Sequence, residues 1–144
     1  MAGLTLGGGY GSLNGRYGLA ADILLGAEVF KAAVAVAPVT HWELYDSIYT
    51  ELYMGLPQEN PEGYRRISPQ LSANALDGTK LLMIHNIEDD NVHFQNSVQM
   101  ADALERAGKK FFMLVYPQKS HGVTGPERKN LLEQETAFFE ENLR

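Results

Sequence analysis

The sequence predicts an α/β domain with a mostly parallel sheet flanked by helices, and three observations support this. The chain has 144 residues, of which 44% are hydrophobic and 21% charged, as in an ordinary globular domain with a substantial core. Short apolar runs typical of buried strands alternate with amphipathic runs typical of helices. Strands that alternate with helices favour right-handed βαβ units, and therefore parallel pairing.

The first half of the chain predicts one strand between helical segments. Residues 18–30 carry a loose apolar face and predict a helix. Residues 31–38 are small and apolar without alternation, which indicates a strand buried on both faces of a sheet. Residues 40–75 are aromatic-rich and irregular, and we expect short helices there around 42–54 and 61–66.

The second half predicts two more strands, each followed by a helix. The strands are expected at 80–85 (KLLMIH) and 109–117 (KKFFMLVYP). The helix between them, 97–108, has Val98, Ala101 and Leu104 on one side and ends at a glycine, a common residue after a helix C-terminus.

The last helix is expected to begin at a capping box made by Thr124 and Glu127, with a proline close to its start. Its apolar face consists of Leu131, Leu132, Phe138, Phe139 and Leu143. Three strands make a narrow sheet for this class of fold, so the chain reads as the C-terminal portion of a wider domain.

Composition excludes several functions. The net charge of −6 argues against a nucleic-acid-binding surface, and the absence of cysteine excludes disulfides and thiolate metal sites. No apolar run approaches the roughly 20 residues of a membrane span, and the first residues lack the basic and apolar regions of a cleavable signal. We therefore expect no nucleic acid partner, no membrane segment and no cofactor, and the compartment stays open.

Ionisable side chains follow two of the three strands. Asp89 lies in an acidic cluster after the strand at 80–85, and His121 follows the strand at 109–117. Consecutive strands of βαβ units are usually neighbours and their carboxyl ends share one edge of the sheet, so these two side chains can meet there. A carboxylate that orients an imidazole is what a Ser-His-Asp triad requires, in the chain order of α/β-hydrolases. Taken singly, an aspartate after a strand is usually a helix cap or turn residue, and a histidine in a loop is usually solvated.

Three segments resemble the prolyl oligopeptidase family of serine peptidases, and within it the dipeptidyl-peptidase-IV-like branch. They are VFKAAVAVAPVTHWELYDSIYTELYMGLP (29–57), LLMIHNIEDDNVHFQNS (81–97) and YPQKSHG (116–122). The resemblance is strongest at DDNVHF and WELYDSIYTE. It implies the C-terminal portion of an α/β-hydrolase fold, a peptide substrate, and cleavage after proline or alanine near a peptide N-terminus.

The same resemblance implies roles for particular residues. Asp89 would be the triad acid, His121 the general base, and Asn91 would reach a backbone carbonyl of the substrate. The pocket for the penultimate residue would be lined by Val39, Trp42, Tyr45, Tyr49 and Val92. Aromatic faces and small aliphatic groups suit a flat pyrrolidine ring, although the same aromatics would also suit ordinary core packing. At Leu52 the chain departs from the family, which has an arginine there.

The sequence has no serine at the position where the family places its nucleophile. The family places a serine in a tight strand-to-helix elbow between small residues, and ungapped counting sets Gly11 and Gly15 over the small positions but Leu13 over the serine. Ser12 is one position early and has large neighbours, while Thr5 is about eight positions out of register. We therefore expect 1–17 to be a Gly-rich leader, a scrambled or truncated elbow.

The remaining residues, 18–144, would be a partial peptidase catalytic domain, incomplete and inactive without an in-register nucleophile. Two other functions stay open: a small esterase that uses Ser12 or Thr5, and a non-catalytic module that associates through the exposed edge of the strand at 32–37. If the complete enzyme exists, the resemblance implies a homodimer through the last helix region.

A metal site is a further, weaker hypothesis. Its ligands would come from His85, His93, Asp89 and Asp90. The spacing of the histidines fits no hydrolytic zinc motif, so we predict no metal.

Overall fold

The computed structural model describes residues 4–5 and 31–143. The helix expected over 18–30 and nearly all of the expected leader 1–17 lie outside the described residues. The strands are β1 (Leu4–Thr5), β2 (Ala32–Val36), β3 (Lys80–Asn86) and β4 (Phe111–Tyr116). The helices are η1 (Trp42–Leu44), α2 (Ser47–Met54), α3 (Pro61–Arg66), η2 (Gln70–Ala75), α4 (Gln95–Arg106) and α5 (Pro126–Asn142).

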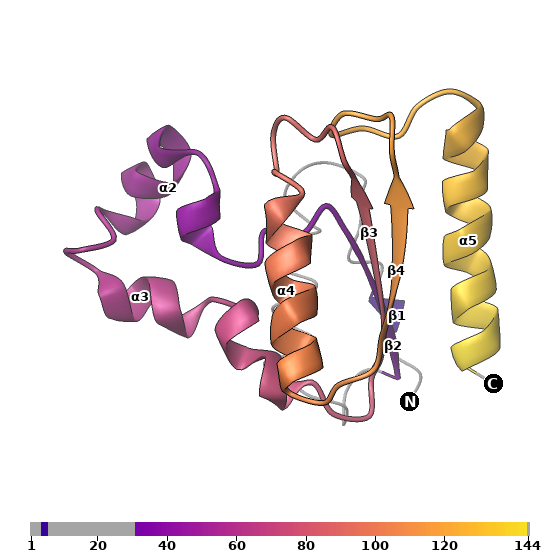
Figure 1. Cartoon of the computed structure of the whole chain (residues 1–144), viewed down its shortest axis with the longest axis horizontal. Helices are drawn as coiled ribbons and strands as arrows, with labels where there is room; N and C mark the ends of the chain where they lie inside the picture. The colour runs from indigo at the N-terminus through magenta and orange to yellow at the C-terminus, as the bar shows by residue number, and fades with distance from the viewer. Residues whose placement is uncertain (1–3, 6–30, 144) are drawn as a thin grey trace.

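The sheet is parallel throughout, with the strands in the order β1-β2-β3-β4. Figure 1 shows α4 and α5 on opposite sides of the sheet, while the excursion that contains α2 and α3 projects away from it. The expected α/β fold, with strands buried between helices, is confirmed. None of the described helices is long and apolar enough to cross a membrane.

The register places the ends of β3 and β4 side by side. Pairing runs from Leu81 opposite Phe111 to Asn86 opposite Tyr116. The ladder extends one step beyond the strands, because the backbone N–H of Ile87 donates to the Tyr116 carbonyl at 3.0 Å. The loops that follow β3 and β4 therefore emerge together at one edge of the sheet.

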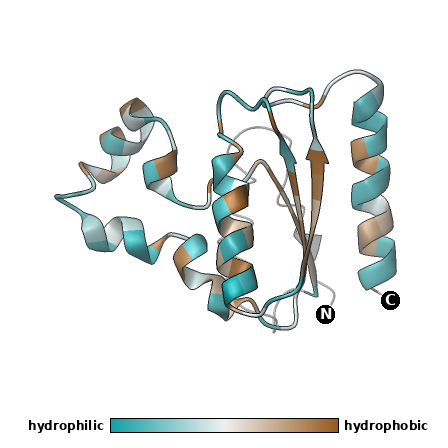
Figure 2. Cartoon of the chain, in the orientation of Figure 1, coloured by the Kyte–Doolittle hydropathy of each residue, from teal (hydrophilic) through white to brown (hydrophobic). Residues whose placement is uncertain are grey.

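Alternate strand residues fill two hydrophobic layers, one on each face of the sheet. On one face, Ala33, Leu81 and Met83 lie in a cluster with Met100 and Leu104 of α4. The opposite face carries Ala32, Val34, Leu82 and Ile84 in a second cluster with Leu131, Phe138 and Phe139 of α5. In Figure 2 brown predominates along β4, the end of β3 is teal, and much of α4 and α5 is teal, as expected for a sheet covered by amphipathic helices on both faces.

The expected apolar faces of two helices are wrong in detail. Val98 is 48% exposed, and α4 instead buries a stripe that contains Ser97, Met100 and Leu104. A serine can occupy this stripe because its hydroxyl has a buried partner, the ring of His85. On α5, Leu132 is 36% exposed, whereas its neighbour Leu131 is buried.

The expected capping box at the start of α5 is also wrong. The N-cap residue is Gly125, with φ +72° and no side-chain capping bond, a conformation that glycine adopts at little steric cost. Glu127 instead forms an ion pair with Lys119 at 3.2 Å. The proline at the first turn, Pro126, is as expected.

The sheet has one more strand than the sequence predicted. In β1, Leu4 and Thr5 pair with Ala32 and Ala33 of β2, so the start of the edge expected to be open is covered. Beyond Ala33, β2 has no strand partner on that side within residues 4–5 and 31–143. Thr5 lies in β1, and the residues on either side of Leu4 and Thr5, where an elbow would be sought, lie outside the described residues.

Candidate active site

Asp89 lies in the tight turn that follows β3. Its Oδ1 accepts hydrogen bonds from the backbone N–H groups of Asn91 at 3.0 Å and Val92 at 2.8 Å. The residue is 5% exposed. An aspartate that accepts bonds from backbone groups two and three residues ahead stabilises its own turn, so the turn holds the carboxylate in one orientation.

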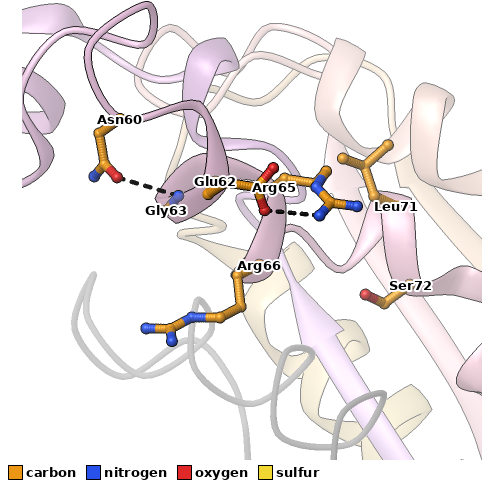
Figure 3. Close-up of a pocket in the computed structure, with 7 residues that line it drawn as sticks. All are labelled: Asn60, Glu62, Gly63, Arg65, Arg66, Leu71 and Ser72. Carbon is orange, nitrogen blue, oxygen red and sulfur yellow. Dashed lines mark hydrogen bonds and ion pairs between the residues drawn. The ribbon is translucent and has the colours of Figure 1, made fainter.

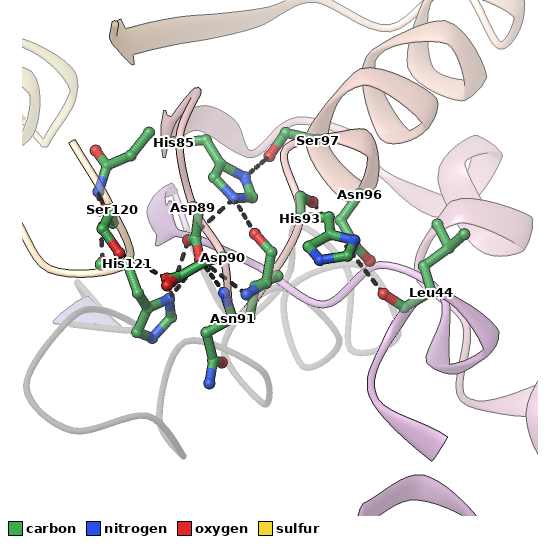
Figure 4. Close-up of polar contacts among 12 residues, drawn as sticks. Leu44, His85, Asp89, Asp90, Asn91, His93, Asn96, Ser97, Ser120 and His121 are labelled. Atoms are coloured by element: carbon green, nitrogen blue, oxygen red, sulfur yellow. Dashed lines mark hydrogen bonds and ion pairs between the residues drawn. The ribbon is translucent and has the colours of Figure 1, made fainter. Parts of the chain in front are cut away.

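His121 meets this carboxylate from the loop after β4. Its Nδ1 lies 2.9 Å from Oδ2 of Asp89 and 3.1 Å from Oδ1 (Figure 4). An ionised carboxylate only accepts hydrogen bonds, so Nδ1 carries the donated proton and Nε2 of the neutral ring is left as an acceptor. The His121 side chain is 34% exposed while that of Asp89 is fully buried, so the imidazole reaches toward solvent from a buried anchor.

The environment of Asp89 keeps its carboxyl group ionised. Burial by itself would raise the pKa of Asp89, but hydrogen bonds from His121, from His85 and from the backbone of Asn91 and Val92 outweigh it and hold the pKa well below its usual range. The carboxylate therefore stays negative over the whole physiological pH range and can orient a histidine throughout it.

A second histidine supports the same turn from inside the protein. His85, the penultimate residue of β3, is 1% exposed and has partners at both ring nitrogens. Nε2 lies 2.7 Å from the Val92 carbonyl and 3.4 Å from Oδ2 of Asp89, and Nδ1 lies 2.7 Å from Oγ of Ser97. Because a carbonyl oxygen can only accept, Nε2 carries the proton, and Nδ1 accepts from the serine hydroxyl when the ring is neutral.

Three aromatic side chains predicted for the pocket gather next to this turn. The ring of Trp42 lies 6.0 Å from that of Tyr45, edge to face, and 6.2 Å from that of Tyr49, nearly parallel. Tyr45 and Tyr49 are 5.7 Å apart, edge to face. These separations fall within the range of favourable aromatic pairs, so the rings form one cluster and not three separate surface residues.

The aromatic cluster contacts the remaining predicted residues. Val39 and Val92 are buried together, with Trp42 and Tyr45 packed against them. The hydroxyl of Tyr45 donates to Oδ1 of Asn91 at 3.2 Å. All the site residues predicted from the sequence thus lie in two connected groups, the Asp89–His121 pair and the aromatic cluster, joined by the turn that follows β3.

Several polar residues hold this arrangement, although the sequence assigned none of them that role and indicated only His85, as a metal ligand. They are Thr40, His85, Asn86, Asn96 and Ser97, each of them buried. A signal for His85 and Asn86 was present, because two polar residues end an otherwise apolar strand (KLLMIHN). Thr40, Asn96 and Ser97 gave no such signal, since their burial depends on partners far away in the chain.

The metal hypothesis gains no support from the geometry. Within residues 4–5 and 31–143, no group of three or more His, Asp or Glu side chains is placed to hold a metal ion. His93 is exposed, and its backbone carbonyl accepts from Nδ2 of Asn96 at 3.2 Å. His85 uses both nitrogens in bonds to protein groups.

A separate pocket of about 890 Å³ lies on the excursion around α3 and η2 (Figure 3). Its wall contains the exposed ion pair between Glu62 and Arg65, at 2.7 Å. It is lined by Asn60, Glu62, Gly63, Arg65, Arg66, Leu71 and Ser72. None of these residues was predicted for the site, and none belongs to the Asp89–His121 pair or the aromatic cluster.

Known proteins match the sequence of this chain over part of their length. The chain is 41% identical over 119 residues to dipeptidyl peptidase 4 of Felis catus, covering 81% of this chain and 16% of that protein. It is 40% identical over 129 residues to prolyl endopeptidase FAP of Bos taurus, covering 88% of this chain and 17% of that protein. The chain thus spans about a sixth of the length of these relatives.

Solved structures agree. A putative dipeptidyl aminopeptidase IV from Bacteroides ovatus superposes with a TM-score of 0.86 at 34% identity, over 90% of this chain and 18% of that one. Dipeptidyl peptidase 4 of Porphyromonas gingivalis gives a TM-score of 0.76 at 40% identity, over 79% of this chain and 16% of that one. The model of the prolyl oligopeptidase family matches residues 6–144. With its sequence, fold and paired strand ends in agreement, the chain belongs to the prolyl oligopeptidase family of serine peptidases.

Proposed function

We propose that this chain carries the acid–base pair and the substrate pocket of a serine peptidase that cleaves after proline or alanine near the N-terminus of a peptide. The observation that supports this most directly is the 2.9 Å contact between Nδ1 of His121 and Oδ2 of Asp89, made by loops from adjacent strands. Two of the relatives are dipeptidyl peptidase 4 and prolyl endopeptidase FAP, and these names support a peptide substrate.

In this proposal Asp89 fixes the tautomer and orientation of His121. Nε2 of His121 takes the proton of a hydroxyl nucleophile as that oxygen attacks the scissile carbonyl, and later gives the proton to the leaving amine. Asp89 stays ionised and stabilises the imidazolium that forms in between. Its lowered pKa suits this role, because the carboxylate does not compete for the proton.

The pocket in this proposal is the aromatic cluster together with Val39 and Val92. A pyrrolidine ring presents flat apolar faces and no donor, which the faces of Trp42 and Tyr49 and the two valines complement. The amide of Asn91, whose Oδ1 already accepts from Tyr45, would donate from Nδ2 to a backbone carbonyl of the peptide.

We further propose that the chain alone has little or no peptidase activity. The position that aligns with the nucleophile is Leu13, whose side chain cannot attack a carbonyl, and Ser12 lies outside the described residues. A fluorogenic dipeptide amide of the Xaa-Pro type tests this, with no turnover above buffer expected. Turnover that disappears in His121→Ala would show that the chain does contain a competent nucleophile. Labelling of Ser12 by a phosphonate probe would point to the small esterase.

Substrate binding can be tested separately from turnover, because the sequence has a single tryptophan, and it lies in the aromatic cluster. Titration with the dipeptide Ala-Pro should change the emission of Trp42 saturably, while Ala-Gly should change it much less. Tyr49→Ala should weaken the response to Ala-Pro. A flat titration with both dipeptides would contradict the pocket. Elution as an oligomer, together with that result, would favour the non-catalytic module.

A further inference from the structure

Strand β3 ends on an amide that is buried between the two loops of the site. Asn86 is 2% exposed. Its Nδ2 donates to the backbone carbonyl of Ser120 at 2.5 Å and lies 3.4 Å from the carbonyl of His121. Both carbonyls belong to the loop after β4, so a side chain of one strand holds the loop of the next.

The amide of Asn86 is committed to this donor role. Turning it over would place Oδ1 against two carbonyl oxygens, which cannot donate to it. In the observed orientation Oδ1 is buried without a hydrogen-bond partner. An unpartnered buried acceptor is unfavourable, so the donated bonds are the contribution that this side chain makes at the end of β3.

A second connection to the same loop is more exposed. The hydroxyl of Ser120 donates to Oδ1 of Asp90 at 2.6 Å, between two residues that are both exposed. Water competes for such groups, whereas the bond from Asn86 is shielded from solvent. Of these two connections to the loop next to His121, the bond from Asn86 is therefore the better shielded from water.

We propose that Asn86 is a positioning residue for His121: by fixing the carbonyls of Ser120 and His121, it holds the imidazole against Asp89. Asn86 touches the backbone of the loop and acts only through it. This inference rests on the proposed function, in which Asp89 and His121 are the acid and the base. It adds one expectation to the proposed function: loss of the buried donor of Asn86 releases the imidazole of His121 from the carboxylate of Asp89.

Nitrogen-15 NMR of the four histidine rings tests this in the full chain. In the unaltered protein, His121 should show a single neutral tautomer with the proton on Nδ1. In Asn86→Ala, which removes the donor, and in Asn86→Asp, which replaces it with an acceptor of the same shape, His121 should show averaged tautomers. His85, which is held by Ser97 and Val92, should keep its signature. Asn130→Asp is the matched control, because Asn130 on α5 accepts a bond from the hydroxyl of Tyr116 and an aspartate can still accept it.

The outcomes separate the two proposals. Averaged tautomers of His121 in the unaltered chain would contradict the Asp89–His121 pair itself. A single tautomer that persists in both folded Asn86 variants would contradict the positioning role and leave the pair intact.

Hydrogen exchange in the unaltered protein supplies a measurement that needs no variant. The side-chain amide of Asn86 should exchange at least about tenfold more slowly than that of exposed Asn74, because it is buried and bonded. If the side-chain amides of Asn86 and Asn74 exchange at equal rates, the inference is overturned, even if neither variant folds.

Discussion

Thr40 and Asn96, separated by 56 positions in the chain, are joined by hydrogen bonds in the protein interior. The backbone N–H of Thr40 donates to Oδ1 of Asn96 at 3.0 Å, and the Thr40 hydroxyl donates to the Asn96 carbonyl at 2.8 Å. Nδ2 of Asn96 also reaches the carbonyl of Leu44 at 3.3 Å. One side chain at the start of α4 thus fixes both ends of the segment that carries Trp42.

Asn96→Ala should therefore destabilise the protein and loosen the aromatic cluster. The substitution leaves the buried N–H of Thr40 without an acceptor, and we expect a loss of about 2–3 kcal/mol in the free energy of unfolding. Urea denaturation measures it, and Asn74→Ala, at an exposed position, should change the value by less than about 0.5 kcal/mol. Similar values for the two variants would show that the bonds between Thr40 and Asn96 contribute little.

Asp89→Asn should lower stability at neutral pH and change its dependence on pH. The folded pKa of Asp89 is lowered, so the stabilisation is fully present above the unfolded pKa of about 3.9 and is lost as pH falls from there toward the folded value. The difference in unfolding free energy between the two proteins should be constant from pH 7 to about pH 5 and shrink below about pH 4. Urea melts at a series of pH values measure it.

The control for this prediction is Asp77→Asn. The side chain of Asp77 is 93% exposed and lies 3.9 Å from Nζ of Lys109. Exposed ion pairs contribute little, so the stability of this variant should follow that of the unaltered chain at every pH. A difference between Asp89→Asn and the unaltered protein that stays constant down to pH 2 would contradict the buried, ionised carboxylate.

Ser97→Ala should destabilise the protein by removing the hydroxyl that lies 2.7 Å from Nδ1 of His85. The buried ring nitrogen then loses its partner, and we expect a cost of about 1–2 kcal/mol. The proton should stay on Nε2, because the Val92 carbonyl still accepts from it at 2.7 Å, and nitrogen-15 NMR of His85 reports this. Ser97→Thr keeps a hydroxyl and should recover part of the lost stability. If Ser97→Ala leaves stability unchanged, the serine hydroxyl contributes little to holding His85.

Leu131 and Leu132 offer a matched pair on α5. Leu131 is 4% exposed in the cluster between α5 and the sheet, and Leu132 is 36% exposed. Leu131→Ala should cost about 2–4 kcal/mol of unfolding free energy because it leaves a cavity, whereas Leu132→Ala should cost less than about 1 kcal/mol. Thermal melting of both variants checks this. The reverse order would mean that the helix presents a different face to the sheet.

The local sequence was sufficient for β2, β3 and β4, though not for β1, and for the meeting of the loops after β3 and β4. Residues 31–38 and 80–85 are apolar on both alternating faces, and only a strand covered by helices on both sides buries all of them. Parallel βαβ connection then forces the groups after successive strands to one edge, which is why Asp89 and His121 could be paired from their positions alone.

Helix faces and caps were harder to predict, because they depend on distant partners. Val98 is more hydrophobic than Ser97, yet α4 buries the serine, because Nδ1 of the buried His85 ring accepts a hydrogen bond from its hydroxyl. Thr124 and Glu127 match a capping box, yet Glu127 pairs with Lys119 from the preceding loop. Such choices are set by competing contacts that no local pattern contains.

The sequence by itself thus determined the class of fold, three of the four strands in their order, and the acid–base candidates after β3 and β4, because hydrophobic periodicity and chain order are local properties. Only the tertiary structure decided what holds those candidates in place. His85 contacts the carboxylate of Asp89, Asn86 donates to the loop of His121, and Asn96 bonds to the segment that carries Trp42. The physical reason is that a buried polar group is stable only with a partner, and these partners come together only when the chain has folded.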